Sequence, residues 1–290
     1  NDYSIGTMKR QPVVIGIGEL LWDMLPTGKK VGGAPVNFAY HASRMGAAGY
    51  AISAVGFDQL GDELLREIDK AGINAIIERV DYPTGTVQVE LNDGMPDYTI
   101  NEGVAWDHIP LTWAMEQLVA KADAVCFGTL AQRSEISRKT IMRLLSSAPA
   151  DAYRILDINI RRDYYSKELV TDSLRSCNVL KINDEELMLL KRLYGKEQDT
   201  DEALSRWLLD QYKLIFLILT AGADYSTIYT PRDISCIKTP EVDVVDTVGA
   251  GDSFTGAFIS ALLQGKPLPV AHQVAVERAA YVCTQSGAWV

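Results

Sequence analysis

Residues 36–71, VNFAYHASRMGAAGYAISAVGFDQLGDELLREIDKA, decide the class of fold that the sequence predicts. Apolar residues recur at helical spacing over 36–45 and again over 60–71, and a short, largely apolar run at 51–55 separates the two. A buried strand between two amphipathic helices is the repeating unit of α/β proteins. We therefore expect a mostly parallel sheet that is covered by helices on both faces.

The same alternation begins earlier, at the β-branched run 13–15, and resumes after residue 107. A length of 290 residues allows two domains or one large α/β unit, and the continuous alternation favours one domain over 8–290, starting at Met8 as a candidate natural start. Ligands of parallel sheets bind beyond the carboxyl ends of the strands, so we expect the functional site there. Further strands are expected at 124–127, 155–158, 179–182, 215–220 and 226–229, and further helices at 111–121, 134–147, 183–194 and 200–212.

One stretch breaks the alternation of strands and helices. Positions 87, 89 and 91 are apolar and the residues between them are polar, which indicates a half-exposed antiparallel strand. Asp93-Gly94 then predicts a hairpin turn, and a return strand follows. We expect a small β-sheet lid built from about 20–34 and 82–106. This lid either covers a ligand cleft or pairs with the lid of a second subunit in a homodimer.

The composition excludes several classes of partner. The chain carries 28 basic and 38 acidic residues, a formal net charge of −10, and no run of Lys and Arg is longer than two, so nucleic acid is not an expected partner. No stretch of 18 apolar residues occurs, so no membrane span is predicted. Because a cationic and apolar leader is also absent, we expect a cytoplasmic location.

The four cysteines lie far apart and form no C-x-x-C pair. We expect all of them to be buried thiols in a reducing compartment. They are Cys126, Cys177, Cys236 and Cys283.

The sequence DTVGAGDSF at 246–254 precedes an apolar helical pattern that runs to Gln264. Two glycines before a helix leave main-chain N–H groups uncovered at its positive end, which is a site for an anion. Asp252 lies next to this predicted anion site. It either caps the helix or accepts a proton from a hydroxyl that attacks a bound phosphoryl group.

A second glycine-rich stretch, VGGAPVN at 31–37, leads into the helix 38–45. Its glycines allow a ligand to approach the main chain, and Asn37 offers a donor and an acceptor for hydroxyl groups. Asp23, upstream, is either a solvated loop residue or a carboxylate that accepts two sugar hydroxyls.

Two familiar nucleotide motifs are not present. Gly16-x-Gly18 lacks the third glycine of a dinucleotide fingerprint, because position 21 is Leu. Neither Gly195-Lys196 nor Gly265-Lys266 fits the P-loop pattern. ATP, if bound, is therefore held by a different loop.

The stretches GGAPVN at 32–37 and DTVGAGDSF at 246–254 together closely resemble the two signatures of the ribokinase, or PfkB, carbohydrate kinases. The resemblance covers the chain from about Val13 to Gly287. The texts GELLWD at 18–23, GTLAQR at 128–133 and DINIR at 157–161 look most like bacterial fructokinases. The resemblance implies a ribokinase-like three-layer α/β/α fold with a mostly parallel central sheet and a small β-sheet lid. It also implies ATP and Mg²⁺ as cofactors.

The resemblance also assigns roles to matching positions. It implies that Asp252 is the catalytic base and that Gly249, Ala250 and Gly251 form the anion hole for the γ-phosphate. It places the sugar at Asp23, Gly33, Asn37 and Arg161, and the nucleotide at Asn183, Thr220, Gly222 and Ala223. It implies that Glu186 acts on Mg²⁺ through water, and that Asp246, Val248 and Gly287 hold a monovalent cation such as K⁺.

Some of these residues have a simpler interpretation. Asn183 and Glu186 have the spacing of a capping box at the start of a helix. Arg161, beside Arg162, has the pattern of surface charge. The chain ends at Val290, just beyond Gly287, where members of the family usually continue, so we expect adenine or cation contacts near this end to be incomplete.

The function expected from this resemblance is ATP-dependent phosphorylation of a hexose, most simply D-fructose at its 6-hydroxyl. A kinase for 2-keto-3-deoxygluconate, or another sugar of this family, is the alternative within the enzyme class. A sugar-binding protein without catalytic activity is the alternative outside it.

Overall fold

The larger of two sheets has nine strands. They are β1 (Val13–Ile17), β4 (Ala48–Gly56), β5 (Asn74–Val80), β8 (Ala124–Phe127), β9 (Tyr153–Asp157), β10 (Val179–Asn183), β11 (Phe216–Ala221), β12 (Tyr225–Tyr229) and β13 (Ile234–Lys238). In this computed structural model, which describes residues 10–290, their order is β13-β12-β11-β10-β9-β8-β1-β4-β5. Every neighbouring pair from β11 to β5 is parallel, and β12 pairs antiparallel with both of its neighbours, β11 and β13. The predicted mostly parallel sheet is confirmed, while Met8 lies outside the described residues.

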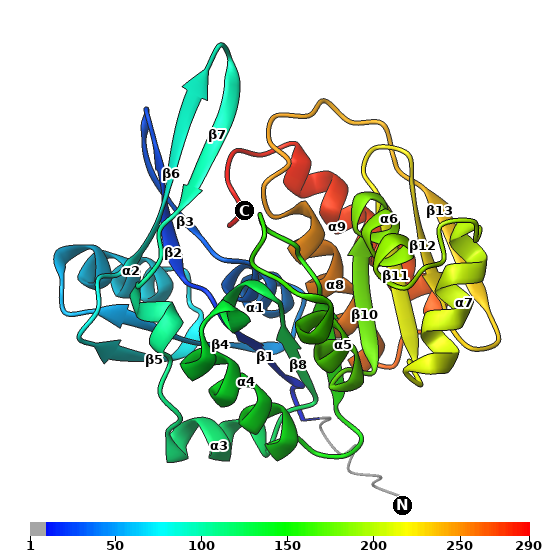
Figure 1. The fold of residues 1–290 in the computed structure, drawn as a ribbon, viewed down its shortest axis with the longest axis horizontal. Helices are drawn as coiled ribbons and strands as arrows, with labels where there is room; N and C mark the ends of the chain where they lie inside the picture. The colour runs from blue at the N-terminus through cyan, green and yellow to red at the C-terminus, as the bar shows by residue number, and fades with distance from the viewer. Residues whose placement is uncertain (1–9) are drawn as a thin grey trace, which may run out of the picture.

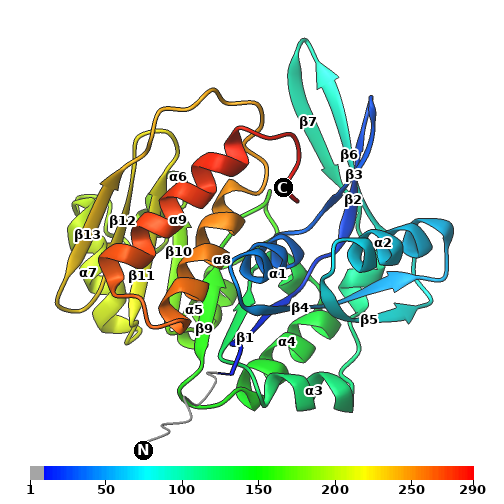
Figure 2. The same ribbon diagram turned by 180° about the vertical axis from the view of Figure 1, so that it is seen from behind.

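Helices cover both faces of this sheet and produce three layers (Figure 1). Figure 2 brings one helical face to the front. That face carries α1 (Ala34–Arg44), α2 (Gln59–Lys70), α8 (Ala250–Leu263) and α9 (Leu268–Cys283). The opposite face carries α3 (Trp113–Val119), α4 (Glu135–Ser147), α5 (Lys167–Arg175), α6 (Asp184–Leu193) and α7 (Asp201–Gln211). Separate apolar clusters fill the space between the sheet and each helical layer, as the alternating pattern predicts.

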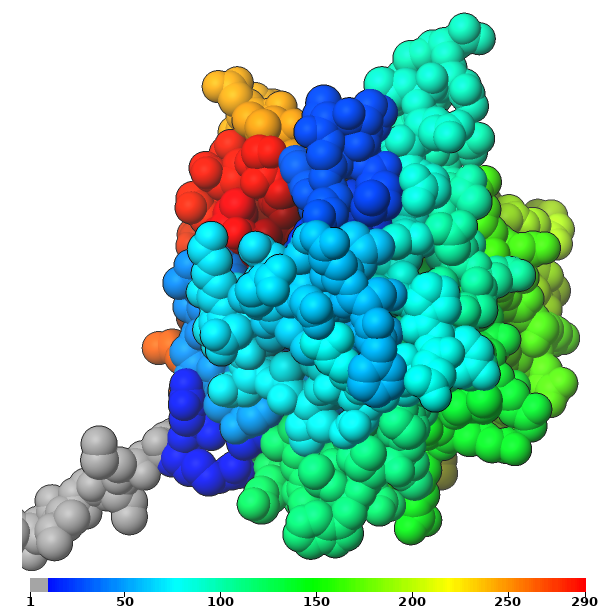
Figure 3. Space-filling model, turned by 90° about the vertical axis from the view of Figure 1, so that its left-hand side faces the viewer, coloured from blue at the N-terminus to red at the C-terminus, as the bar shows by residue number. Residues whose placement is uncertain are grey.

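The smaller sheet projects beyond this core (Figures 1 and 3). It contains β2 (Leu21–Leu25), β3 (Gly28–Gly32), β6 (Gly85–Asn92) and β7 (Met95–Ile100) in the order β3-β2-β6-β7. Asp93 and Gly94 join β6 to β7 with φ angles of 51° and 79°, the left-handed conformation that a tight hairpin requires. The predicted hairpin is confirmed. All four strands fall inside the segments predicted for the lid, and the bounds of the single domain stay a prediction.

Two short 3₁₀ helices, η1 (Ala105–His108) and η2 (Leu130–Arg133), complete the described elements. No helix within residues 10–290 is both long and apolar enough to cross a membrane.

The prediction that all four cysteines are buried was wrong for two of them. Cys126 and Cys177 are buried and free, but Cys236 is exposed and Cys283 is half-buried. The reason for Cys236 is its place on β13, the edge strand of the large sheet, where side chains on one face remain open to solvent.

Candidate active site

The glycine-rich loop at the start of the stretch 246–254, which we call the anion loop, leads into a helix whose residue Asp252 is hydrogen-bonded to the predicted sugar-binding stretch 31–37. Asn37 in α1 donates from Nδ2 to Oδ2 of Asp252 over 3.1 Å, although the two residues are 215 positions apart in the sequence. Asp252 is the third residue of α8, which starts after Gly249 and has no side-chain cap. The carboxyl group of Asp252 is therefore held by a neighbouring helix and does not cap its own.

Several charged groups act on the carboxyl group of Asp252. Burial raises its pKa, and the nearby carboxylate of Asp157 raises it further, whereas the hydrogen bond from Asn37 and the charge of Lys181 lower it. Glu19 adds a smaller upward effect. The resulting pKa is about 7, far above the ordinary value of 3.8. A carboxyl group with this pKa is suited to accept a proton from a substrate hydroxyl near neutral pH.

Lys181 places a positive charge next to the main chain of the anion loop. It lies on β10 opposite Asp157 of β9, and both side chains are buried. A Cβ atom on Gly251 would lie 2.9 Å from Nζ of Lys181, so the ammonium group touches the main chain of the loop. Burial alone would lower the pKa of Lys181, but the carboxylates of Asp157, Glu186 and Asp252 raise it above its ordinary value, so the lysine is charged. This charge supplies a local positive potential in a chain of net charge −10.

The loop before α8 leaves main-chain donors free at the helix end. Gly249 has a φ of 79°, in the left-handed region that favours glycine. The N–H of Ala250 donates to Thr247 O over 3.2 Å, so this predicted member of the anion hole is already used in a turn. The N–H groups of Gly251 and Asp252 donate to no oxygen within residues 10–290. The loop thus presents unused donors at the positive end of α8.

The glycines predicted for the sugar side are required by close packing. Gly33 has a φ of 122°, and a Cβ there would lie 2.4 Å from the carbonyl oxygen of Glu19. A Cβ on Gly32 would lie 2.6 Å from Oδ2 of Asp23, so that carboxylate rests against the main chain of β3. Burial raises the pKa of Asp23, and Arg161 lowers it in part.

Arg161 and Glu19 complete this side of the site. Arg161 is exposed in the loop after β9, yet its charge reaches both Asp23 and Glu19 and lowers their pKa values. Glu19 is 4% exposed, and its Oε2 atom has no hydrogen-bond partner among residues 10–290. No role was assigned to Glu19 from the sequence, although it lies inside the quoted stretch 18–23.

The residues predicted to meet the nucleotide lie at the carboxyl ends of β10 and β11. Asn183 and Glu186 form a capping box: Asn183 Oδ1 accepts from Glu186 N over 2.8 Å, and Glu186 Oε1 accepts from Asn183 N over 3.0 Å. The second carboxylate oxygen of Glu186 accepts from Ile160 N over 2.8 Å. The simpler interpretation of this pair is thus present in the structure, and each Glu186 oxygen is already engaged. Thr220 lies opposite Asn183 in the strand register, and Gly222 has a φ of 54°.

The three residues predicted for a monovalent cation are brought together. Asp246 accepts from Val248 N over 3.0 Å with one oxygen and from Gly287 N over 3.1 Å with the other. Ala223, from the predicted nucleotide set, is exposed in the loop after β11. Within residues 10–290, no group of three or more His, Cys, Asp or Glu side chains has an arrangement suited to a metal ion.

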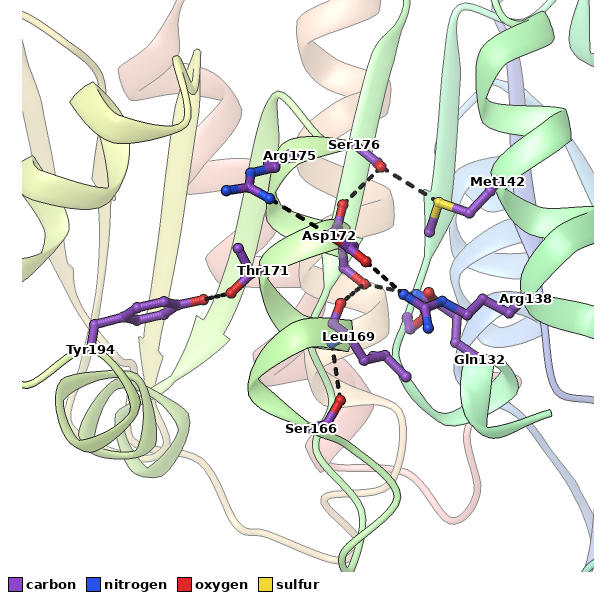
Figure 4. Close-up of polar contacts among 12 residues, drawn as sticks. Gln132, Arg138, Met142, Ser166, Leu169, Thr171, Asp172, Arg175, Ser176 and Tyr194 are labelled. Atoms are coloured by element: carbon purple, nitrogen blue, oxygen red, sulfur yellow. Dashed lines mark hydrogen bonds and ion pairs between the residues drawn. The ribbon is translucent and has the colours of Figure 1, made fainter. Parts of the chain in front are cut away.

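Two surface cavities lie away from these residues. One of about 540 Å³ is lined by residues that include Gln132, Arg138 and Ser166 near the start of α5, and one of about 340 Å³ borders Met142 and Ser176 near its end. Figure 4 shows how polar contacts between α4 and α5 hold their walls. Arg138 bonds Asp172 over 2.8 Å, and Ser176 donates to Met142 Sδ over 3.5 Å. Neither cavity is lined by a residue that was predicted for catalysis or for binding of sugar, nucleotide or metal.

Sequence reasoning missed four side chains that contact or charge this site. Lys181 had a detectable signal, since it interrupts an apolar strand two residues before Asn183. Asp157 and Glu19 lay inside quoted motifs without a role, and Trp289 gave no signal. Each of them acts through contacts between distant segments.

The fold and the glycine-rich loop with its carboxyl group define a ribokinase-like α/β protein. The sequence model described as pfkB family carbohydrate kinase matches residues 19–289. The chain therefore belongs to the pfkB family and is an enzyme, a carbohydrate kinase.

Relatives with this fold include sugar kinases of several kinds. The chain is 28% identical to a fructokinase of Rhizobium leguminosarum bv. trifolii over 269 residues, which cover 86% of this chain and 79% of the relative. It is 27% identical to an ATP-dependent 6-phosphofructokinase of Thermoanaerobacterium thermosaccharolyticum over 296 residues, 96% of this chain and 89% of the relative. Among solved structures, an uncharacterized sugar kinase from Pyrococcus horikoshii in complex with ATP superposes with a TM-score of 0.81 at 25% identity, covering 96% and 94% of the two chains. A fructokinase from Vibrio cholerae O395 with fructose, ADP and calcium ion bound has the same fold, with a TM-score of 0.81 at 20% identity, covering 97% of this chain and 95% of that chain.

Proposed function

We propose that this carbohydrate kinase transfers the γ-phosphoryl group of ATP to a hexose hydroxyl, namely the 6-hydroxyl of D-fructose. The observation that carries the proposal is the carboxyl group of Asp252, with a pKa of about 7, beside unused N–H donors at the start of α8. A base and an anion site in contact are what phosphoryl transfer to a hydroxyl needs.

Asp252 takes the proton of the attacking hydroxyl. Its Oδ2 is held by Asn37, which leaves Oδ1 to face the acceptor. As the oxygen of the sugar forms its bond to phosphorus, the bond to the leaving oxygen of ADP breaks in line, and negative charge develops on the phosphoryl oxygens. The N–H groups of Gly251 and Asp252, the positive end of α8 and the charge of Lys181 stabilise that charge.

ATP is placed along the carboxyl ends of β10 and β11, with Asn183, Thr220, Gly222 and Ala223 beside it. Mg²⁺ bound here would neutralise phosphate charge, and Glu186 would act on it through water, since both Glu186 oxygens already accept from main-chain N–H groups. The loop that joins Asp246, Val248 and Gly287 is the proposed site for K⁺.

The acceptor sugar is placed between Asp23, Gly33, Asn37 and Arg161, below the small sheet. Carboxylate and amide groups suit the hydroxyls of a neutral hexose. The exposed guanidinium of Arg161 would also pair with the carboxylate of a sugar acid, which favours 2-keto-3-deoxygluconate as the second candidate acceptor. Closure of the small sheet would exclude water, which competes with the sugar for the phosphoryl group.

A panel of sugars tests this proposal. Fructose, glucose, ribose and 2-keto-3-deoxygluconate are each incubated with ATP and Mg²⁺, and ADP and the phosphorylated sugar are measured by mass spectrometry. The account predicts fructose 6-phosphate and ADP in equal amounts, with the highest kcat/KM for fructose. A preference for the sugar acid would replace the acceptor. Binding of fructose without ADP formation would show a sugar-binding protein that lacks catalytic activity.

A further inference from the structure

Residues 287–290, which we call the C-terminal segment, pack against α1 and the anion loop. The carbonyl oxygen of Ala288 accepts a hydrogen bond of 2.7 Å from Nε2 of His41 in α1. A Cβ atom on Gly249 would lie 2.8 Å from Cβ of Ala288, so the segment touches the loop that precedes α8. Figures 1 and 2 both show this end of the chain beside the start of α8 and the small sheet.

The bond from His41 is fixed in direction. Arg278 donates from Nε to Nδ1 of His41 over 3.3 Å, so the ring proton is on Nε2 and is donated to Ala288. Burial lowers the pKa of His41 to about 4, so the ring is neutral at physiological pH. The C-terminal segment is thus held by a defined donor in the core of the molecule.

Trp289 connects this segment to the catalytic carboxyl group. Its indole ring stacks on Tyr40, with ring centres 5.6 Å apart and planes 14° apart. Its Nε1 donates a hydrogen bond of 2.9 Å to Oδ1 of Asn37. Asn37 in turn donates from Nδ2 to Oδ2 of Asp252 over 3.1 Å. The three side chains form one line of hydrogen bonds that ends at the proposed base.

The direction of this line follows from the chemistry of the groups. An indole N–H can only donate, so the amide oxygen of Asn37 must face Trp289 and the amide nitrogen must face Asp252. Without the indole donor, the amide is free to turn over and present its oxygen to Asp252. A carbonyl oxygen beside a carboxylate disfavours ionisation and requires a proton between them.

We propose that Trp289 is a positioning residue for catalysis: it fixes the amide of Asn37 so that Asp252 is held as an ionisable base with one oxygen free for the acceptor hydroxyl. The proposal deepens the proposed function and rests on it, because it needs Asp252 to be the base. It assigns a role to a residue that lies outside both glycine-rich stretches.

The other charged groups that face Asp252 do not depend on Trp289. Asp157 at the end of β9 and Glu19 after β1 raise the pKa of Asp252, and Lys181 on β10 lowers it. Cys126 on β8 is also near, and burial keeps the pKa of its thiol well above the ordinary value, so this thiol is neutral. Loss of the indole donor therefore changes one influence on Asp252 and leaves these four in place.

The first experiment replaces Trp289 by Phe in the full chain, which keeps a ring on Tyr40 and removes the N–H. The loss of one neutral hydrogen bond corresponds to a fall in kcat of about tenfold. We expect a small change in KM for the sugar and an acid limb of kcat/KM that moves to higher pH. Tyr40→Phe is the matched control: it keeps the stacked ring, removes only the hydroxyl that accepts from Arg44, and should leave kcat and the pH profile unchanged.

A second experiment needs no substrate. The carboxyl carbon of Asp252 is followed by NMR against pH in the ligand-free protein labelled with ¹³C-aspartate. The pKa of Asp252 should be higher in Trp289→Phe than in the unaltered chain. In the Asn37→Ala background, adding Trp289→Phe should leave the pKa of Asp252 unchanged. An unchanged titration in Trp289→Phe, or equal effects of Trp289→Phe in both backgrounds, overturns the proposal.

The two proposals fail in different ways. If no sugar is phosphorylated by the unaltered chain, the proposed function is wrong, whatever the titration shows. If sugar is phosphorylated but Trp289→Phe keeps its kcat and its titration, Trp289 is only a packing residue.

Discussion

The carboxyl edge of the large sheet, where its parallel strands end, differs from the small sheet in how the side chains are held. At the carboxyl edge, Asn37 is hydrogen-bonded to both Asp252 and Trp289, and the charges of Asp157 and Lys181 act on Asp252. In the small sheet, Leu91 and Met95 are 62% and 71% exposed, and little packs against them. We infer that the proposed catalytic groups lie on the packed core, whereas the small sheet is the part that would close over the acceptor.

The largest effect is expected from Asp252→Asn at the edge of the large sheet. This change keeps the shape of the side chain and removes its ability to accept a proton, so kcat should fall about 10³-fold. The affinity for the sugar, measured by calorimetry, should change only a few-fold. A variant with normal turnover would remove the assigned role and with it the contrast between the two regions.

Lys181→Met should lower kcat about 10²-fold, because a positive charge next to the anion loop is lost. The charge of Lys181 lowers the pKa of Asp252, so its removal should raise that pKa and move the acid limb of the rate profile to higher pH. Lys191→Met is the matched control, since Lys191 on α6 is about as buried as Lys181 but pairs with Asp201 of α7 over 2.7 Å. Equal losses in both variants would mean that burial of a lysine, and not its place, decides the effect.

Tyr98→Asp tests the small sheet. Tyr98 on β7 is 49% exposed, and with Leu91 on the same face of β6 it forms an apolar surface that we propose a second subunit covers. The substitution should convert a dimer to a monomer in light scattering and lower kcat/KM by a few-fold, with kcat nearly unchanged. Thr99→Asp, on the opposite face of the same strand, should have neither effect. A chain that is monomeric without any substitution would leave the small sheet as a lid alone.

The smallest effect concerns stability. Because the pKa of Asp252 is about 7 in the folded chain and 3.8 ordinarily, the folded form keeps a proton that the unfolded form releases. The stability from this group is fully present below about pH 4 and is lost as the pH rises through 7. Asp252→Asn should therefore raise Tm by several degrees at pH 8.5 relative to the unaltered chain, and by less at pH 5. Thermal unfolding without ligands measures both values, and an equal difference at the two pH values would contradict the assigned pKa.

The fold was largely predictable because its pattern is local. The strand predicted at 124–127 coincides with β8, and the helix predicted at 134–147 differs from α4 by one residue at its start. The pattern gave no prediction for β13 or α9, which are the edge strand and the helix beside it. Contacts with distant segments decide which of their side chains are buried, so the apolar residues of β13 and α9 show only a weak local periodicity.

The site was predictable only in part. Gly33 and Gly249 were recognisable because they stand in glycine-rich stretches. The structure explains why glycine is needed at both positions, since each has a positive φ angle and a Cβ atom there would be too close to its neighbours. The pairing of Lys181 with Asp157 across two strands, and the bond from Trp289 to Asn37 across 252 positions, are properties of the folded chain. No spacing in the sequence contains them.

The most direct test of the central claim is the dependence of kcat/KM on pH for the unaltered chain with its sugar. The account predicts a tenfold fall per pH unit below about pH 7, where Asp252 becomes protonated, and no such dependence in the residual activity of Asp252→Asn. A profile that is flat from pH 5.5 to 8 would contradict the claim that Asp252 is the base.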